Sequence, residues 1–448
     1  MSSATPPRPS ADGAHPGPAP DVVAPDAALP TGEAVVQELP WRWSVQGRIF
    51  LIGGLGFMFD AWDVTLNGVM IPLLREEWAL DKADAAWIGT ANLIGMAVGA
   101  FLWGTIADRI GRKAAFAWTL AIFSVFTIAG ALTDSLLWFA VFRFMAGIGL
   151  GGVWSVLSAY VTETWPAHQR GKAIGFVLAA YPIGSALAAQ LSSFLMPDWR
   201  LLFLIAGLSA MLPLAFVLIG FRESEVWKRD RGVTQEGESV SIKALFTGGR
   251  ARLTIIASIV CILVMVPYYG ATTWFPSYLA RERAFDAQTI GNHFTLMSLT
   301  AFLGYFFFGW LADKVGRKPA IMASLISTGL LIAAYGYSTS PSILWVVAPL
   351  YSFCMVFPGL FAPYISELYP TRMRTTGSGF TYNVGRGLSA LGPIVMGGIA
   401  TAASFSTGIV IAGGLFLLAA VIMLTLPRVD AVTADDTEEL GEREAVAV

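Results

Sequence analysis

Residues 104–113 read Gly-Thr-Ile-Ala-Asp-Arg-Ile-Gly-Arg-Lys, and residues 309–318 read Gly-Trp-Leu-Ala-Asp-Lys-Val-Gly-Arg-Lys. The second stretch begins 205 residues after the first (309 − 104) and keeps both glycines, the alanine, the aspartate and the final Arg-Lys. Another pair, Glu-Thr-Trp-Pro-Ala-His-Gln-Arg at 163–170 and Glu-Leu-Tyr-Pro-Thr-Arg-Met-Arg at 367–374, repeats after 204 residues (367 − 163). Two patterns whose offsets agree within one residue predict a duplicated unit.

The sequence around these motifs is apolar enough to cross a lipid bilayer. Of its 448 residues, 55% are hydrophobic and 13% are charged, whereas roughly a quarter of the residues in a soluble domain are charged. A membrane-spanning helix needs about 20 mostly apolar residues. We therefore expect an all-α membrane protein of two six-helix pseudo-repeats, with twelve transmembrane helices near 48–72, 84–106, 114–133, 136–161, 171–194, 200–221, 253–279, 287–311, 319–337, 342–365, 376–399 and 405–426.

One connection between the predicted spans is long, polar and basic, and it separates two bundles. We predict an N-terminal bundle at 41–221, a cytoplasmic linker at 222–252 and a C-terminal bundle at 253–428. A disordered tail at 1–40 and an acidic tail at 429–448 flank them. Lys and Arg are concentrated on the side of the linker and the tails, so the positive-inside rule places both termini in the cytoplasm of a multi-pass cell-membrane protein.

Composition also excludes several classes of function. The formal net charge of −2 lacks the basic excess of a nucleic-acid-binding surface. Cys261 and Cys354 lie in apolar runs, and two of the three histidines, His15 and His168, fall outside the spans, so we expect no metal site and no enzyme. The expected partners are a small solute, protons and the lipid bilayer; we expect a monomer that uses the proton gradient and no cofactor.

The paired loops resemble the signature of the major facilitator superfamily, G-x-x-x-D-R-x-G-R-[RK], and residues 143–151 add the family's helix-4 glycine pattern. The positive-inside rule alone accounts for part of the basic charge, but it does not explain the acids. The resemblance implies a cytoplasmic ion-pair latch that stabilises the outward-open state. Its expected residues are Asp108, Arg109, Arg112, Glu163, Asp313, Arg317 and Glu367.

Two acids lie near the middle of the first predicted span. Asp60 and Asp63 are three residues apart, so they share one helix face. Ionisable groups at membrane depth are costly, which indicates a function or a partner for each. Arg143 of the fourth span is the expected partner of Asp63, and the resemblance implies that this pair titrates during transport. A purely structural ion pair is the alternative, and we predict proton coupling at Asp60, Asp63 and Arg143.

Arg386 lies at mid-depth in the eleventh span and is the best anion-binding candidate in the chain. A guanidinium stays charged and can hold a carboxylate through two parallel hydrogen bonds. The alternative is that Arg386 pairs with Asp60 or with a carbonyl group. Tyr382 and Asn383 precede it on the same span and complete this part of the predicted substrate site.

The remaining substrate-binding candidates are aromatic side chains and one histidine. Aromatic residues of helices 7 and 10 would line the central cavity of the resembled fold, although Trp and Tyr also collect at membrane interfaces. A lone histidine within a span is more often a packing residue. These candidates are Tyr269, Trp274, Tyr364 and His293.

Residues 58–64, 87–102 and 369–379 resemble the metabolite–proton symporter branch that includes bacterial niacin transporters. The resemblance implies proton-coupled uptake of a small organic anion, an aromatic carboxylate of the nicotinate or benzoate kind. Helix 7 lacks the paired glutamines of sugar porters, which disfavours sugars. A sugar or polyol symporter, a drug or metabolite exporter, a transporter-like sensor and a membrane-embedded enzyme are the alternatives.

Overall fold

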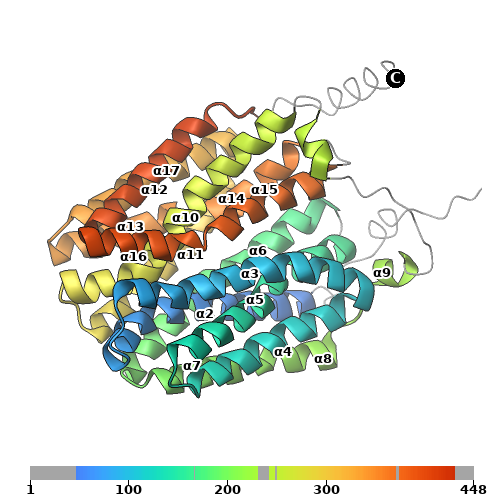
Figure 1. Ribbon diagram of the computed structural model, residues 1–448. Coiled ribbons are helices and arrows are strands. Elements are labelled where there is room, and N and C mark those ends of the chain that lie inside the picture. Colours follow the sequence, from blue (N-terminus) through green and yellow to red (C-terminus); the bar gives the residue numbers. More distant parts are fainter. Residues whose placement is uncertain (1–46, 166, 231–241, 248–249, 370–372, 429–448) are drawn as a thin grey trace, which may run out of the picture.

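The computed structural model describes residues 47–165, 167–230, 242–247, 250–369 and 373–428. Both predicted tails lie outside these residues. Every regular element in the described ranges is a helix (Figure 1). The elements are α2 (Arg48–Glu77), α3 (Lys82–Ile110), α4 (Arg112–Ala131), α5 (Leu136–Thr164), α6 (Ala167–Leu195), α7 (Trp199–Ser209), α8 (Met211–Gly220), α9 (Glu225–Asp230), the 3-10 helix η2 (Ile242–Phe246), α10 (Arg250–Glu282), α11 (Ala287–Val315), α12 (Arg317–Tyr337), α13 (Pro341–Cys354), α14 (Phe357–Glu367), α15 (Arg374–Leu388), α16 (Leu391–Ala402) and α17 (Phe405–Met423).

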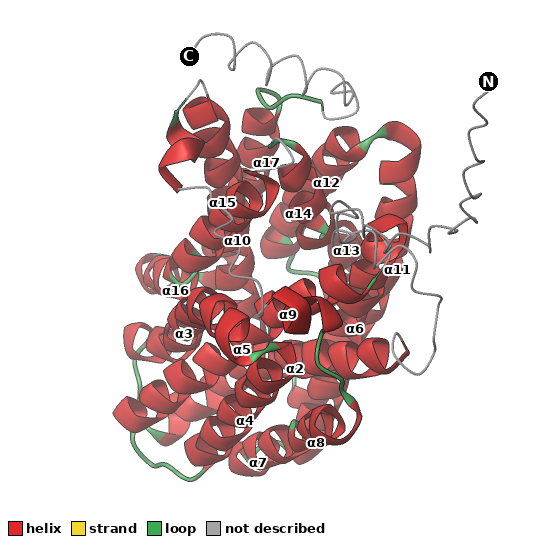
Figure 2. Cartoon of the chain, turned by 90° about the vertical axis from the view of Figure 1, so that its right-hand side faces the viewer, coloured by secondary structure: helices red, strands yellow, loops and turns green. Residues whose placement is uncertain are grey.

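The helices form two groups, which we call the N half (α2–α8) and the C half (α10–α17). Within the N half α5 packs on α3 and α4, and α2 packs on α6; within the C half α17 packs on α10 and α12. Figure 2 shows the two groups one above the other. They meet where α2 contacts α10, α6 contacts α11 and α3 contacts α16. We call the end with α9 the linker end and the opposite end the far end.

Twelve spans are present, but three of them are interrupted. Ten stretches of the described chain are long and apolar enough to cross a membrane, and α2 and the pair α15–α16 are the other two spans. The predicted spans at 200–221, 342–365 and 376–399 are each built from two helices, α7–α8, α13–α14 and α15–α16, a division that the sequence prediction did not include. A proline ring clashes with the carbonyl four residues earlier, so the helices end at Ser209, Cys354 and Leu388, at or next to the fourth residue before Pro213, Pro358 and Pro393.

The duplication extends to the backbone of the paired motifs. Gly111 between α3 and α4 has φ 98°, and Gly316 between α11 and α12 has φ 90°. L-residues with side chains avoid this region, which explains the glycine at the same place in both motifs. The N-caps repeat as well, because Asp81 accepts a hydrogen bond from the third residue of α3 and Asp286 from the third residue of α11.

Helices α3 and α5 approach so closely that only glycine fits along their contact. A Cβ atom on Gly95 would lie 2.1 Å from the Phe144 carbonyl oxygen, and one on Gly99 would lie 2.1 Å from the Ile148 carbonyl oxygen. These neighbours are backbone atoms, which cannot rotate away. Small residues at such spacing are the usual way in which membrane helices bring their backbones together. This contact sets the position of α5, which carries Arg143.

We expect Gly99→Ala to destabilise the protein strongly, whereas Gly104→Ala on the same helix leaves its stability unchanged. The added methyl group at 99 forces α3 and α5 apart, and overpacking of this kind costs about 1–3 kcal/mol. No atom lies within 4 Å of a Cβ at Gly104. The melting temperatures of the two purified variants in detergent check this expectation. Equal melting temperatures would contradict the packing described here.

Candidate functional site

A buried ion pair links α2 to α5 in the middle of the N half. The Arg143 guanidinium donates from Nη1 to Oδ1 of Asp63 at 2.6 Å, and neither side chain is exposed to solvent. Asn92 and Asn67 donate to the second carboxylate oxygen of Asp63 at 3.1 and 3.3 Å. Both oxygens of Asp63 are therefore occupied by protein donors.

Arg143 is held on its other side as well. Its Nη2 donates to the Thr127 hydroxyl at 3.0 Å, and the guanidinium carbon lies 4.8 Å from the ring centroid of Phe203. An aromatic face and a hydroxyl compensate part of the cost of burying the guanidinium. The pair thus joins α2, α4, α5 and α7 into one unit.

Asp60 lies one turn before Asp63 on α2 and has a different environment. Its residue exposure is only 3%, and its Oδ1 has no hydrogen-bond partner among the described residues. Arg386 on α15 has a residue exposure of 7%, and its Nε also lacks a partner in the described part of the chain. The two groups interact electrostatically across the boundary between the halves. Asp60 and Arg386 are therefore an oppositely charged pair, and each has a polar atom without a hydrogen-bond partner among the described residues.

Tyrosines surround this charged pair. Tyr269 of α10, Tyr382 of α15 and Tyr181 of α6 all interact electrostatically with Arg386. Asn383, another predicted site residue, is half-buried on the same helix as Arg386. The sequence analysis did not single out Tyr181. Its position in mid-span was a usable signal, because tyrosines in membrane helices collect at the interfaces.

A pocket of about 100 Å³ lies between the halves. Its walls come from α2 and α6 on one side and from α10, α11 and α13 on the other. Most of the lining is aromatic or carries a hydroxyl group, which suits a flat, partly polar molecule. The lining residues are Thr65, Tyr181, Pro182, Ser185, Tyr268, Thr272, Phe275, Pro276, Phe294, Met297, Ser298, Ala301, Tyr305, Tyr351, Ser352 and Met355.

None of the seven predicted substrate-binding residues is among those that line this pocket. Three of them, Trp274, Tyr364 and His293, have packing partners inside the C half. Trp274 donates from Nε1 to the Pro393 carbonyl at 2.9 Å, which ties α10 to α16. The Tyr364 hydroxyl donates to the Pro427 carbonyl at 2.8 Å at the linker end. His293 is fully buried, and its Nε2 lies 3.1 Å from the hydroxyl of a tyrosine on α12. Their aromatic or polar character did not distinguish packing from binding.

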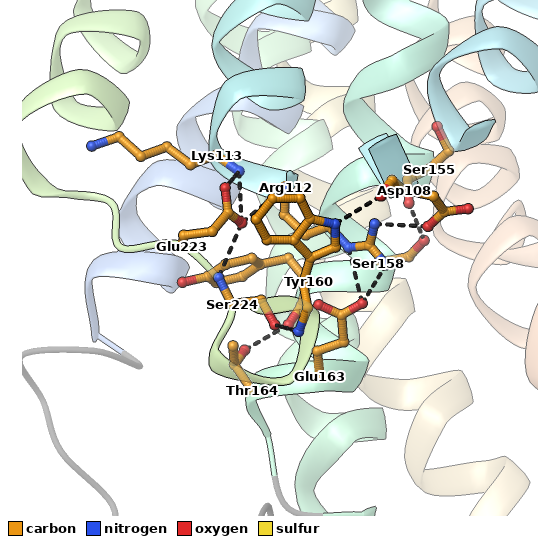
Figure 3. Close-up of polar contacts among 11 residues, drawn as sticks. Asp108, Arg112, Lys113, Ser155, Ser158, Tyr160, Glu163, Thr164, Glu223 and Ser224 are labelled. Atoms are coloured by element: carbon orange, nitrogen blue, oxygen red, sulfur yellow. Dashed lines mark hydrogen bonds and ion pairs between the residues drawn. The ribbon is translucent and has the colours of Figure 1, made fainter. Parts of the chain in front are cut away.

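The first motif builds a polar network at the linker end of the N half (Figure 3). Arg112 donates to Asp108 at 2.7 Å and, from Nε and Nη2, to Glu163 at 2.9 and 2.5 Å. Glu223, which the sequence analysis missed, accepts from the Arg112 backbone N–H at 2.8 Å and so caps α4. Trp227 of α9 donates to the Asp108 carbonyl at 2.8 Å. All these residues belong to the N half or to the linker that follows it.

The second motif reproduces part of this network in the C half. Arg317 forms an ion pair with Glu367, as Arg112 does with Glu163. Asp313 is exposed, and Arg109 of the first motif is exposed too. The Arg112–Glu163 and Arg317–Glu367 ion pairs each join two residues of the same half.

Among the residues that the structure describes, the side-chain hydrogen bonds and ion pairs between the halves lie at the far end and at mid-depth. Glu76 of α2 forms an ion pair with Arg281 of α10 at 3.0 Å. Gln190 of α6 donates to the Thr295 hydroxyl of α11 at 2.9 Å. The two groups of helices are therefore held together at the side away from the linker.

Lys82 makes a further far-end contact between the halves, and this one is partly buried. Its ammonium group donates to the carbonyl oxygen of Ala400 in the last turn of α16 and lies 5.0 Å from the ring centroid of Phe405. A cation is favoured at a helix C-terminus, where unpaired carbonyl groups point outward. A side chain of the N half thus caps a helix of the C half.

Comparison with known families accounts for this arrangement. The model of the family described as "Major Facilitator Superfamily" matches residues 53–291 and 257–447. The chain belongs to this superfamily. Members of the Major Facilitator Superfamily are membrane transporters, so the duplicated halves and the pocket between them belong to a transporter and not to an enzyme.

Similar proteins carry related small molecules. This MFS transporter is 32% identical to the niacin transporter NiaP of Acinetobacter baylyi over 86% of its own length and 93% of that protein. It is 28% identical to the benzoate transport protein of the same organism, over 80% and 83% of the two chains. Among solved structures, the inward-open xylose transporter XylE of E. coli matches with a TM-score of 0.73 at 18% identity, covering 88% of this chain and 99% of XylE. This last likeness shows the fold alone.

Proposed function

We propose that this transporter carries a small aromatic carboxylate into the cell together with a proton. One observation carries the proposal: Asp60 and Arg386, from opposite halves, are buried and interact, and each has a polar atom without a partner among the described residues. Both also interact with Tyr181, which lines the aromatic pocket. Groups of this kind at membrane depth mark substrate and ion pathways. The similarity to niacin and benzoate carriers supports the same class of substrate.

Arg386 provides the anion site. A carboxylate that accepts two parallel hydrogen bonds from the guanidinium would use the Nε–H group that the protein leaves unpaired. Burial strengthens this interaction, because water does not compete for the donors. The pocket lined by Tyr181, which interacts with Arg386, has aromatic walls that favour a ring attached to the carboxylate.

Asp60 provides the coupling. As a carboxylate it competes with the substrate for the positive charge of Arg386, whereas in its protonated form it leaves that charge available. A bound substrate anion in turn favours the protonated form of Asp60 by repulsion. Proton and anion therefore bind together more favourably than either does alone, which is a reciprocal coupling between two sites.

We assign Asp63 and Arg143 a supporting part in this scheme. Three protein donors already occupy the Asp63 carboxylate, and Arg143 bonds to groups on two other helices. This pair positions α2 and with it Asp60, one turn away. The sequence suggested that both acids take part in proton coupling. In this proposal Asp60 alone carries the proton.

Transport requires the halves to separate alternately at the two ends of the pocket. We assign the linker end to the cytoplasm, in line with the basic residues on that side. The far-end contacts made by Glu76, Gln190 and Lys82 must break for the pocket to open outward. The Arg112 and Arg317 networks stay within their halves and keep each linker end rigid during this movement.

We expect Lys82→Met to shift the protein toward a state with an open far end. Methionine keeps the length of the side chain but cannot donate to the Ala400 carbonyl. A hydrogen bond from a charged group contributes about 1.5–3 kcal/mol, so the open state should gain about tenfold in population relative to the closed one.

Spin-label distance measurements check this shift. Asp134 and Tyr337 are exposed residues next to the far-end loops of the N half and the C half. Labels on cysteines at these two positions, with the native cysteines replaced by alanine, should give a longer distance population in Lys82→Met than in the parent. An unchanged distance distribution would refute the proposal that the Lys82 contact keeps the far end closed.

Uptake into proteoliposomes tests the proposed function. An inside-alkaline pH gradient should drive labelled nicotinate or benzoate into vesicles that contain the protein, and a protonophore should stop it. Vesicles without protein are the essential control, because weak acids also cross lipid in their neutral form. Uptake no faster than in empty vesicles, or uptake of xylose and not of the acids, would refute the proposal.

A further inference from the structure

The pocket contains a cluster of tyrosines. Outside it, the hydroxyls of Tyr160, Tyr278 and Tyr364 each donate to a main-chain carbonyl, at 2.6, 2.7 and 2.8 Å. Tyr305 of α11 and Tyr351 of α13 line the pocket, and neither hydroxyl is hydrogen-bonded to another of the described residues. Neither hydroxyl is among the fully buried polar atoms without a partner, so both are accessible from the pocket. A ligand in the pocket can therefore donate to them or accept from them.

The tyrosine hydroxyls converge from four helices. Tyr268 of α10 interacts electrostatically with Tyr305 and with Tyr351, and it also interacts with Tyr181 of α6. All four side chains line the same pocket. The pocket therefore has a polar part built by both halves, surrounded by apolar groups such as Phe275.

Tyr181 connects this polar part to the charged pair. It lines the pocket and interacts electrostatically with both Asp60 and Arg386. A rigid aromatic acid whose carboxylate binds Arg386 would direct its ring past Tyr181 into the pocket. The side of the ring remote from the carboxylate would then face the hydroxyls of Tyr305 and Tyr351.

We propose that Tyr305 and Tyr351 select aromatic acids with a hydrogen-bonding atom on the ring, a hydroxyl or a ring nitrogen, over acids with a plain hydrocarbon ring. A tyrosine hydroxyl can donate to a ring nitrogen and can accept from a ring hydroxyl, so one site serves both kinds of substrate. The inference rests on the proposed function, because it takes Arg386 as the site of the carboxylate.

Equilibrium binding of three acids to the purified full-length protein tests the selection. We expect 4-hydroxybenzoate and nicotinate to bind about tenfold more tightly than benzoate, the difference that one neutral hydrogen bond of about 1.4 kcal/mol gives. Tyr305→Phe and Tyr351→Phe should each reduce this preference to less than about threefold and leave the affinity for benzoate unchanged. Tyr337→Phe, at an exposed far-end tyrosine, is the matched control and should keep the full preference.

The outcomes separate this inference from the proposed function. If the acids bind and Arg386→Ala abolishes their binding, but benzoate equals the other two in the parent, the selection is refuted and the anion site stands. The selection is also refuted if both phenylalanine variants keep the full preference or lose affinity for all three acids equally. If none of the acids binds, or if Arg386→Ala binds them normally, the proposed function fails and this inference fails with it.

Discussion

Replacing Arg386 by alanine is expected to weaken the binding of aromatic carboxylates by about 100-fold or more. Two hydrogen bonds to a charged group contribute about 1.5–3 kcal/mol each, and each 1.4 kcal/mol corresponds to a factor of ten in affinity. The aromatic walls remain in the variant, so weak apolar binding of the ring can persist. Calorimetric titration of the purified protein with nicotinate and benzoate measures this loss.

Arg386→Lys is the control that separates charge from geometry. Lysine keeps the positive charge but lacks the planar fork, so we expect an affinity between those of the parent and the alanine variant. The melting temperature of each variant without ligand shows whether the fold is retained. Parent-like affinity in a folded Arg386→Ala protein would remove the anion site from the account.

Asp60→Asn is expected to abolish accumulation against a gradient while preserving exchange. Asparagine resembles the protonated aspartate in shape and charge, but its side chain cannot release or take up a proton during the cycle. The variant should therefore bind substrate and catalyse counterflow between labelled and unlabelled acid. In proteoliposomes, net pH-driven uptake should fall to the level of protein-free vesicles, because the pH gradient no longer supplies energy to the cycle.

Asp63→Asn is the matched comparison for Asp60→Asn. It removes a carboxylate one turn away that is already hydrogen-bonded to other protein groups. It leaves the buried Arg143 without its counter-charge, and breaking a buried pair in this way costs about 3–5 kcal/mol. We expect a lower melting temperature and less folded protein. If Asp60→Asn still concentrates substrate, or if a stable Asp63→Asn protein is the uncoupled one, the proton site has been placed on the wrong acid.

The features that could be predicted from the sequence are those for which the alternative arrangement would cost much free energy. Charged residues inside a span must have partners or a function, so Asp63, Arg143 and Arg386 could be singled out from the sequence, and the expected contact between Asp63 and Arg143 is present. The twelve spans follow from the demand that lipid places on the backbone. The repeated motif resembled the signature of the superfamily. Its glycines Gly111 and Gly316 occupy a backbone region that only glycine adopts readily, which gives a physical reason for their place in the motif.

Features that depend on three-dimensional proximity could not be predicted in the same way. Pro213, Pro358 and Pro393 interrupt their spans, whereas Pro182 and Pro267 lie inside continuous helices. Neighbouring helices can satisfy the freed carbonyl groups, and the local sequence does not show where they do so. The roles of tyrosines were hidden for a similar reason.

Tyr364 and Tyr305 illustrate this limit. Both are tyrosines within apolar spans of the C half, and the sequence favoured Tyr364 as a binding residue. The structure ties the Tyr364 hydroxyl to a carbonyl and places Tyr305 in the wall of the pocket. The difference lies in which partner each hydroxyl meets after packing, a property that residue type and spacing do not contain.

Proton uptake on substrate binding is the most direct test of a single site shared by anion and proton. Purified protein in weakly buffered solution near neutral pH is mixed with saturating nicotinate, and an indicator dye reports protons taken from solution. The account predicts uptake of up to about one proton per bound acid by the parent and none by Asp60→Asn, because the proton binds Asp60. Binding without proton uptake by the parent, or equal uptake by Asp60→Asn, would contradict it.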